Sequence, residues 1–314
     1  MPATAPSSCS RSSSPGSAAR RRAPEATVVA WAERCRRRVP LRQGTVSMAS
    51  RPTLALTLPQ TVVVTGAASG LGYELCRLLL DAGVTTIGVD RAAAVADLSG
   101  EADYKHVAGN VSDEETWQAV EAELKKSGTT SLGLVTAAAI LDVGTIIETS
   151  KEMLARTLDV NVVGTAMAIK ALLPRMIDNG GGPIVVVGSV SATFAEQQLA
   201  AYSASKAAAR ALARTVAMDH ARQGIRVNVL SPGPMMAGLF KRHLESAADS
   251  QKFLATRANR QPGGSILDPK QVALSVAYLL SDQSGAFIGA DLMADGGLST
   301  SFDFRTGAEG ASID

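Results

Sequence analysis

Residues 61–83, TVVVTGAASGLGYELCRLLLDAG, decide the fold of this chain. The stretch begins with apolar residues at consecutive positions, which is typical of a parallel strand buried on both faces. A glycine-rich turn comes next, and then a segment of helical periodicity that ends at Gly83. This order points backbone N–H groups at the helix N-terminus outward, where they can bind phosphate. We therefore expect the first unit of a dinucleotide-binding fold here.

The turn reads TGAASGLG and supplies the residues that a pyrophosphate would meet. Glycines permit the tight turn, the close approach of the ligand and the packing of helix on strand. A strand before the turn and a helix after it favour phosphate binding over a plain glycine-rich turn. The candidate residues are Thr65, Gly66, Ser69, Gly70, Leu71 and Gly72.

Strand and helix patterns alternate along the rest of the chain. Strand patterns recur at residues 85–90, 131–139, 182–189, 224–233 and 290–297, and helical patterns at 113–128, 150–176, 200–223 and 268–282. Parallel strands joined through helices form right-handed crossovers, so helices cover both faces of one sheet. The sequence therefore predicts an α/β fold, a Rossmann-type doubly wound parallel sheet in three αβα layers, formed by a single domain over residues 55–302.

Residues 1–47 differ from this domain in composition. They carry nine arginines and two glutamates, a net charge of +7, which leaves −5 for the rest of a chain whose total is +2. A segment so rich in Ser, Arg, Ala and Pro is expected to be disordered. It is interpreted as a transit peptide or as a translated stretch upstream of a start at Met48, and less favourably as a basic arm for nucleic acid or membranes. Residues 303–314 form a polar tail without a recognisable pattern.

The composition of the domain excludes several classes of function. Of the three cysteines only Cys76 lies inside it, so no internal disulfide is expected, and no spacing indicates a metal site. Its mild acidity argues against nucleic acid as a partner. No apolar run approaches the roughly 18 to 20 residues of a membrane span. We expect a cytoplasmic protein without membrane association, or an organellar one if residues 1–47 are a transit peptide.

Asp90 bears on the choice of nicotinamide cofactor. It ends the second strand, 18 residues after Gly72. A carboxylate at this place accepts the hydroxyls of the adenosine ribose and repels a 2′-phosphate, which favours NAD over NADP. Arg91 favours NADP instead, because an arginine beside the ribose can receive a phosphate.

Tyr202 and Lys206 form the candidate chemical centre. In AYSASKAA they stand at positions i and i+4 of one helical pattern, which puts both side chains on the same face. Moving a hydride to or from an alcohol carbon requires a group that takes or gives the hydroxyl proton. The ordinary pKa of a phenol, about 10, is too high for this task, and a neighbouring ammonium lowers it.

The motifs TGxxxGxG and YxxxK together resemble those of the short-chain dehydrogenase/reductase family. The resemblance implies a catalytic tetrad of Asn161, Ser189, Tyr202 and Lys206. Ser189 stands thirteen positions before Tyr202, where the family's serine binds the substrate oxygen. Asn161, in LDVNVVGT, matches an asparagine that supports a water leading to the lysine. Homodimers or homotetramers, paired through helices at 151–176 and 200–222, are implied as well.

The same resemblance extends the set of expected cofactor contacts. GNVSD at 109–113 corresponds to the stretch that touches the adenine, and Pro232-Gly233 to a turn beside the nicotinamide. Besides the residues of the turn, the expected contacts are Asp90, Arg91, Asn110, Val111, Ala137, Tyr202, Lys206, Pro232, Gly233 and Met235.

The chain departs from the family pattern in two places. The usual Asn-Asn-Ala-Gly after the fourth strand reads Thr136-Ala137-Ala138-Ala139, and Ala237 stands where a cofactor-touching threonine is usual. Losing the amides is expected to loosen that region, and Ala139 lacks the backbone freedom of glycine. We expect both departures to affect the affinity for the cofactor more than the chemical reaction.

The expected substrate is a small secondary alcohol or ketone. Residues 235–265 lie where the family carries its lid, with Met235, Met236, Leu239 and Phe240 as apolar candidates and Lys241, Arg242, His243, Arg257 and Arg260 as cationic ones. Glu196, Gln197 and Gln198 are expected to face the pocket and to favour a sugar, polyol or sugar acid. The alternatives are an NADPH-dependent 3-oxoacyl or other ketoreductase and a non-catalytic dinucleotide-sensing regulator. An extended-branch epimerase is disfavoured by the short sequence after Pro232.

Overall fold

A single sheet of seven parallel strands forms the centre of the fold. The computed structural model describes residues 55–300. The strands are β1 (Thr61–Thr65), β2 (Thr85–Asp90), β3 (Tyr104–Ala108), β4 (Leu132–Thr136), β5 (Gly182–Val187), β6 (Ile225–Pro232) and β7 (Asp291–Ala294), in the order β3-β2-β1-β4-β5-β6-β7. The strand order reverses on the two sides of β1, which pairs with both β2 and β4. Ligands of such sheets bind outside the carboxyl ends of the strands at this reversal.

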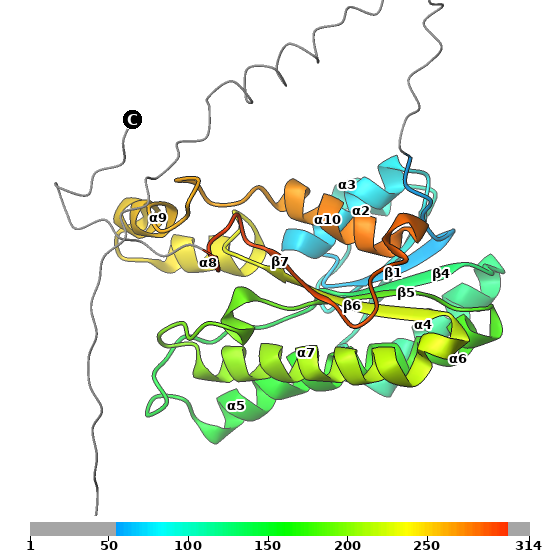
Figure 1. The fold of residues 1–314 in the computed structure, drawn as a ribbon, viewed down its shortest axis with the longest axis horizontal. Helices are drawn as coiled ribbons and strands as arrows, with labels where there is room; N and C mark the ends of the chain where they lie inside the picture. The colour runs from blue at the N-terminus through cyan, green and yellow to red at the C-terminus, as the bar shows by residue number, and fades with distance from the viewer. Residues whose placement is uncertain (1–54, 301–314) are drawn as a thin grey trace, which may run out of the picture. The chain divides into compact units, whose positions relative to one another are not determined.

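Helices cover both faces of the sheet, as Figure 1 shows. One face carries α2 (Gly70–Asp81) and α10 (Pro269–Leu280), and the other carries α4 (Glu114–Ser127), α6 (Gly164–Asp178) and α7 (Ala200–His220). The predicted three-layer, doubly wound α/β fold is confirmed. The remaining helical segments are α3 (Ala96–Ser99), α5 (Lys151–Leu158), η1 (Asp159–Val163), η2 (Val190–Ala192), η3 (Ala221–Gln223), α8 (Gly238–Ser246), α9 (Ser250–Ala258) and η4 (Asp282–Ser284).

Two apolar cores lie on opposite sides of the sheet. Successive residues of β1 alternate between them, with Val63 in one core and Val62 and Val64 in the other. This explains the consecutive valines, because side chains of neighbouring strand residues point to opposite faces. On α7 the inner face is a row of buried alanines at Ala209, Ala213 and Ala217, so this helix lies close to the sheet.

The strand predictions hold within two or three residues at their ends, with one omission. The segment Tyr104–Ala108 forms β3, which the sequence pattern did not reveal. It is an edge strand, and Lys105 and Ala108 are exposed on it. Its two buried residues, Tyr104 and Val107, belong to the cores on opposite faces of the sheet and are separated by more exposed residues, so it lacks the continuous apolar run of the central strands. The interpretations of residues 1–47 and 303–314 concern segments outside the described residues.

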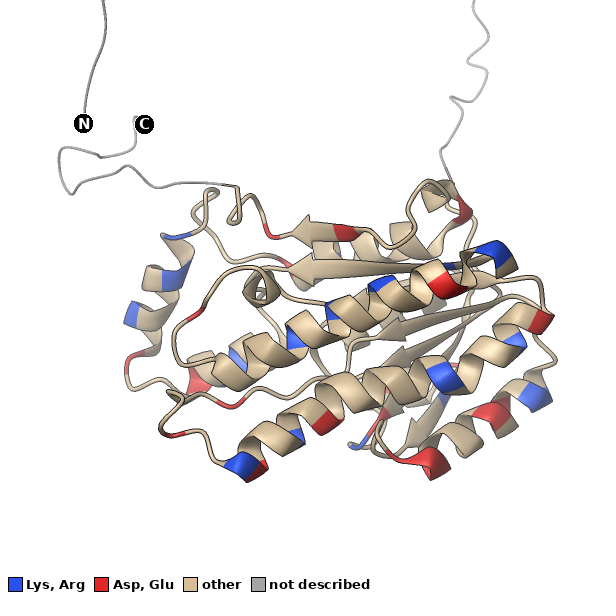
Figure 2. Cartoon of the chain, turned by 60° about the horizontal axis from the view of Figure 1, so that its bottom comes forward, with Lys and Arg blue, Asp and Glu red and all other residues tan. Residues whose placement is uncertain are grey.

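The run Lys151–Asp178 is long and apolar enough to cross a membrane, judged by length and composition alone. No such run was expected from the sequence. In the structure its inner side packs into the core under the sheet, with Ala168, Leu172 and Met176 fully buried. Figure 2 shows positive and negative residues intermixed along the outward sides of the helices on this face.

Candidate active site

A cavity of about 680 Å³ opens at the carboxyl ends of the strands. Its walls include the residues that come after β1, β2, β4, β5 and β6, together with parts of α7, α8 and α9. The cavity therefore lies where the strand order reverses, as expected for a dinucleotide site. Among the described residues no group of three or more His, Cys, Asp or Glu side chains is arranged to hold a metal ion.

The glycine-rich turn forms one wall of this cavity. A Cβ on Gly72 would lie 2.3 Å from the Gly66 carbonyl oxygen, so only glycine fits there. Gly66 has a φ of 74°, in the left-handed region that favours glycine. Helix α2 begins at Gly70 without a side-chain cap from Ser69 and without an acidic residue in its first turn. The first amides of α2 are thus available to a phosphate, and the turn fits a dinucleotide.

Thr65 supports the turn from below and does not line the cavity, which differs from its expected contact with the cofactor. Its buried hydroxyl oxygen accepts hydrogen bonds from the amides of Ala137 and Ala138, both at 3.0 Å. The end of β1 is in this way tied to the residues that come after β4.

Asp90 lines the cavity with its carboxylate fixed. One oxygen accepts the amide of Ala68 at 3.1 Å and the other accepts the amide of Ala92 at 3.0 Å. Arg91 also lines the cavity and is exposed. Asn110 donates to Ser112 Oγ at 2.8 Å, which holds the 109–113 stretch in place. The other expected contacts that line the cavity are Val111, Ala137, Pro232, Gly233 and Met235, together with Ser69, Gly70 and Leu71 of the turn.

Tyr202 and Lys206 lie one turn apart on α7, and both line the cavity. The Lys206 ammonium is 5.7 Å from the centroid of the Tyr202 ring and donates to the Val187 carbonyl at 2.8 Å. Burial lowers the pKa of Lys206 to about 8, because charge is costly away from water. Burial also raises the pKa of Tyr202 to about 12; the Ser189 hydroxyl opposes this rise and the Glu196 carboxylate adds to it.

Ser189 begins the turn after β5 and faces the cavity. Its hydroxyl oxygen accepts the Ser191 amide at 3.2 Å and the Ser191 hydroxyl at 2.8 Å. Both acceptor positions are thereby used, which leaves the Ser189 hydrogen to donate toward Tyr202 or a substrate oxygen. Ser191 itself does not line the cavity, and its two bonds to Ser189 orient the Ser189 hydroxyl.

Asn161 is buried beneath the cavity and does not line it. It was expected within a regular helix, but it lies in the π-helical turn η1. Its side-chain amide accepts the Ile140 amide at 2.9 Å, donates to the Ile140 carbonyl at 3.0 Å and donates to Ser205 Oγ at 2.9 Å. Ser205 in turn donates to the Tyr202 carbonyl at 2.7 Å, so Asn161 joins the segment after β4 to α7.

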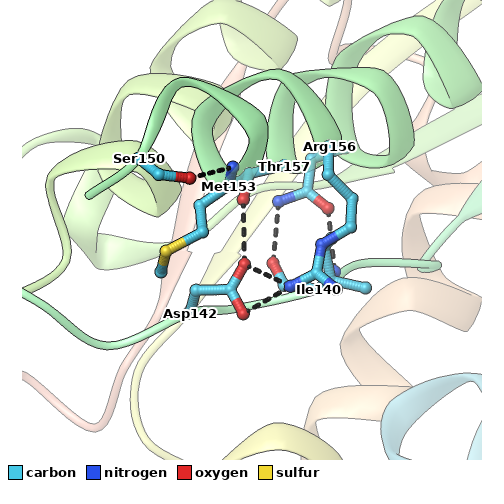
Figure 3. Close-up of polar contacts among 7 residues, drawn as sticks. Ile140, Asp142, Ser150, Met153, Arg156 and Thr157 are labelled. Atoms are coloured by element: carbon cyan, nitrogen blue, oxygen red, sulfur yellow. Dashed lines mark hydrogen bonds and ion pairs between the residues drawn. The ribbon is translucent and has the colours of Figure 1, made fainter. Parts of the chain in front are cut away.

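The segment after β4 is also anchored to α5, as Figure 3 shows. Asp142 accepts two bonds from Arg156, at 2.7 and 2.8 Å, and Ser150 caps the helix by accepting the Met153 amide. Both members of the Asp142–Arg156 pair line the cavity. Sequence reasoning missed them, because fourteen residues separate the partners and neither belongs to a motif.

The lid, α8 and α9, forms a further wall of the cavity. The expected lid residues that line it are Met235, Leu239, Phe240, Arg242, His243 and Arg257, whereas Met236, Lys241 and Arg260 do not. Of the three polar residues before α7 only Glu196 lines the cavity, and Gln197 and Gln198 are exposed instead. Ala237 caps α8 without a side-chain bond, and the next residue, Gly238, packs against Gly70.

Comparison with known proteins places this site in a family. A family model described as enoyl-(acyl carrier protein) reductase matches residues 66–299. The chain is 32% identical to galactitol 2-dehydrogenase (L-tagatose-forming) of Cereibacter sphaeroides over 74% of this chain and 92% of that protein. It belongs to the short-chain dehydrogenase/reductase family.

Two further relatives extend the comparison. Cis-4-hydroxycyclohexanecarboxylate dehydrogenase of Sinomonas cyclohexanicum is 32% identical over 76% of this chain and 96% of that protein. The ligand-free structure of an aldohexose dehydrogenase from Thermoplasma acidophilum superposes with a TM-score of 0.73 at 28% identity, covering 80% of this chain and 99% of that one. This short-chain dehydrogenase/reductase is an NAD(P)-dependent oxidoreductase that acts on CH–OH groups of a small molecule.

Proposed function

We propose that this enzyme interconverts a secondary alcohol and a ketone in a small polar substrate, with NAD as the cofactor and Tyr202 as the acid and base. The observation that carries the proposal is the meeting of Tyr202, Lys206 and Ser189 on one cavity wall, while the glycine-rich turn and Asp90 line the same cavity. This supports a reaction between a dinucleotide and a substrate oxygen beside the phenol.

Proton transfer at the Tyr202 hydroxyl is the step that these residues perform. In oxidation Tyr202 takes the proton of the substrate hydroxyl, and in reduction it returns it. Ser189 donates a hydrogen bond to the same substrate oxygen and stabilises negative charge on it. A nicotinamide bound in this cavity would accept or supply the hydride.

The buried ammonium of Lys206 favours the ionised form of Tyr202. With a pKa of about 8, Lys206 keeps its proton at pH 7. The pKa of Tyr202, about 12 in the ligand-free protein, is too high for a base at that pH. An oxidised nicotinamide bound in the cavity would add a second positive charge to that of Lys206 and would lower the pKa of Tyr202 further.

The preference for NAD rests on Asp90. Its fixed carboxylate at the end of β2 suits the two ribose hydroxyls and repels a 2′-phosphate. Arg91, which lines the cavity beside it, is the observation that favours the second candidate, an NADPH-dependent ketoreductase. A comparison of kcat/KM with the two cofactors distinguishes the candidates, and we expect the higher value with NAD.

The polar substrate is supported by the charged side chains at the lid end of the cavity and by the relatives. One relative is named for galactitol and another for aldohexose. We therefore propose a sugar, polyol or sugar acid.

A homodimer or homotetramer paired through α6 and α7 completes the proposal. A shallow surface groove between these helices is lined mainly by apolar side chains, including Ile169, Leu173, Ile177, Leu212 and Val216. Sedimentation of the purified protein, with a monomer as the contrary result, tests this part.

The decisive experiment measures NAD reduction by the purified protein with a panel of polyols, sugars and sugar acids. We expect turnover by the wild type and a loss of at least about 100-fold in Tyr202→Phe, in the range of general acid–base contributions. Equal turnover by both proteins would refute the mechanism. NAD binding without turnover of any alcohol would instead support a dinucleotide-sensing regulator.

A further inference from the structure

Two ion pairs line the cavity beyond the catalytic residues. Glu196, in the loop before α7, pairs with Arg257 of α9, and the distance between Oε1 and Nη1 is 2.5 Å. Asp142, after β4, pairs with Arg156 of α5. In each pair the two charges offset one another, so neither pair presents a net charge to a ligand.

The Glu196–Arg257 pair is the better placed of the two for contact with a substrate. The Glu196 carboxylate is near enough to Tyr202 to raise the pKa of the phenol. Both side chains are partly exposed, at 25% for Arg257 and 34% for Glu196, whereas Arg156 is 61% exposed. The pair therefore lines the same cavity as Tyr202 and retains polar surface there.

Arg257 is held in place by more than its ion pair. Its guanidinium lies 5.2 Å from the centroid of the Phe253 ring, and that ring contacts His243 at a centroid distance of 4.9 Å. Among residues 55–300 the only hydrogen-bond partner of the guanidinium is Glu196. A guanidinium has five N–H donors and a carboxylate has about four acceptor positions, so the described residues leave most of both sets unused.

An ion pair of this kind offers acceptors and donors side by side. A neighbouring pair of hydroxyl groups matches it, because one hydroxyl donates to the carboxylate while the other accepts from the guanidinium. A substrate carboxylate would be repelled by Glu196 or would have to break the pair. A hydrocarbon would cover both charges without replacing their bonds to water, which is costly.

We propose that the Glu196–Arg257 pair recognises hydroxyl groups adjacent to the reacting carbon of an uncharged polyol or sugar. The inference rests on the proposed function and narrows its substrate class, since it ranks neutral polyols above sugar acids.

Three substrates test the proposal: a hexitol, the aldonate of the same configuration, and a cyclic secondary alcohol without further hydroxyls. The variants are Glu196→Gln and Arg257→Gln. Matched controls are Glu245→Gln on α8 and Lys252→Gln on α9, two exposed residues that do not line the cavity. Binding of the hexitol is also measured by calorimetry, independently of turnover.

We expect each variant to raise KM and Kd for the hexitol by about 10- to 100-fold, as for hydrogen bonds to charged groups. The kcat/KM for the simple alcohol, taken at the plateau of its pH profile, should change by less than about twofold, because that alcohol does not engage the pair. The double variant should bind the hexitol only a little more weakly than either single variant, since the two residues act as one unit.

Several results would overturn the proposal. A lower KM for the aldonate in Glu196→Gln with a higher one in Arg257→Gln would indicate an anion site. An equal loss of kcat/KM on all three substrates would indicate that the pair only holds the lid closed. Unchanged binding of the hexitol would indicate that the pair has no role in recognising hydroxyl groups.

Failure of the proposed function gives a different result. A wild type that oxidises only the simple alcohol refutes the recognition of hydroxyls and leaves the Tyr202 chemistry standing. A wild type that oxidises no alcohol with NAD refutes the proposed function, and calorimetry with the hexitol then decides the role of the pair by itself.

Discussion

Lys206→Met should change the stability of the ligand-free protein in a way that depends on pH. Burial lowers the pKa of Lys206 from its ordinary value of 10.5 to about 8. At pH 7 the folded protein thus holds an ammonium that would be more stable in the unfolded chain. With about 1.4 kcal/mol for each tenfold change in proton affinity, the cost to folding at pH 7 is about 3 kcal/mol.

The sign of the pH dependence is set by which state binds the proton. Between pH 8 and 10.5 the unfolded chain keeps the proton of Lys206 while the folded protein releases it, so wild-type stability rises with pH in this window. The cost remaining at pH 9.5 is about 1.4 kcal/mol, so about 2 kcal/mol is regained between pH 7 and 9.5. Tyr202, with a pKa of about 12, stays protonated in the folded protein over this range.

Urea unfolding of the wild type and Lys206→Met at pH 7, 8 and 9.5 measures the effect. The variant also loses the bond to the Val187 carbonyl, but that loss is independent of pH and cancels when the differences are compared. We expect the stability of the variant relative to the wild type to fall by about 2 kcal/mol from pH 7 to 9.5. Lys125→Met, which changes an exposed lysine of α4, is the control and should show no trend.

A relative stability that is constant with pH to within about 0.5 kcal/mol, the scale of extrapolation error, would refute the reasoning. It would mean that the ammonium of Lys206 is solvated or paired in the ligand-free protein. The enzyme would then bear no cost in stability for holding a charge beside the Tyr202 phenol.

Three further changes address other parts of the site. Gly72→Ala should weaken NAD binding by at least about tenfold, since its Cβ would lie 2.3 Å from a carbonyl oxygen of the turn; Gly100→Ala, with open space around it, should leave the calorimetric Kd unchanged. Thr65→Val should lower the free energy of unfolding by about 2 to 4 kcal/mol in urea titrations, because two backbone amides lose their acceptor. Glu196→Gln should lower the pKa of Tyr202, so the pH at which kcat/KM for oxidation rises should move downward; a profile that is unchanged or moves upward contradicts this.

The fold was predictable because each strand and helix is marked by residues that are close together in the sequence. Consecutive β-branched residues, such as Val62–Val64, mark a strand covered on both faces, and the glycine-rich turn indicates that a helix begins directly after that strand. The edge strand β3 escaped prediction because only Tyr104 and Val107 of its residues are buried, so it has no continuous apolar run. Boundaries were less certain than elements, since the first and last residues of a strand look like the turns beside them.

The parts of the site that escaped prediction depend on contacts between residues far apart in the chain. Glu196 meets Arg257 across 61 positions, and Asn161 bonds Ile140 across 21. Neither spacing forms a motif, so both contacts depend on how the loops close over the sheet. The conformation of Gln198 was likewise not predictable. It adopts a left-handed φ of 64°, and a turn of this kind in a loop cannot be inferred from the alternation of strand and helix patterns along the sequence.

The absence of the family's side-chain amides after β4 is offset by backbone contacts from two directions. Thr65 accepts the amides of Ala137 and Ala138 from below, and Asn161 binds both the amide and the carbonyl of Ile140 from the side. The segment is therefore held without any polar side chain of its own between residues 137 and 140. The buried hydroxyl of Thr136, just before this segment, still has no hydrogen-bond partner among the described residues. Because the backbone is fixed from outside, the loss of the amides should affect the ribose end of the cavity less than the sequence pattern alone implies.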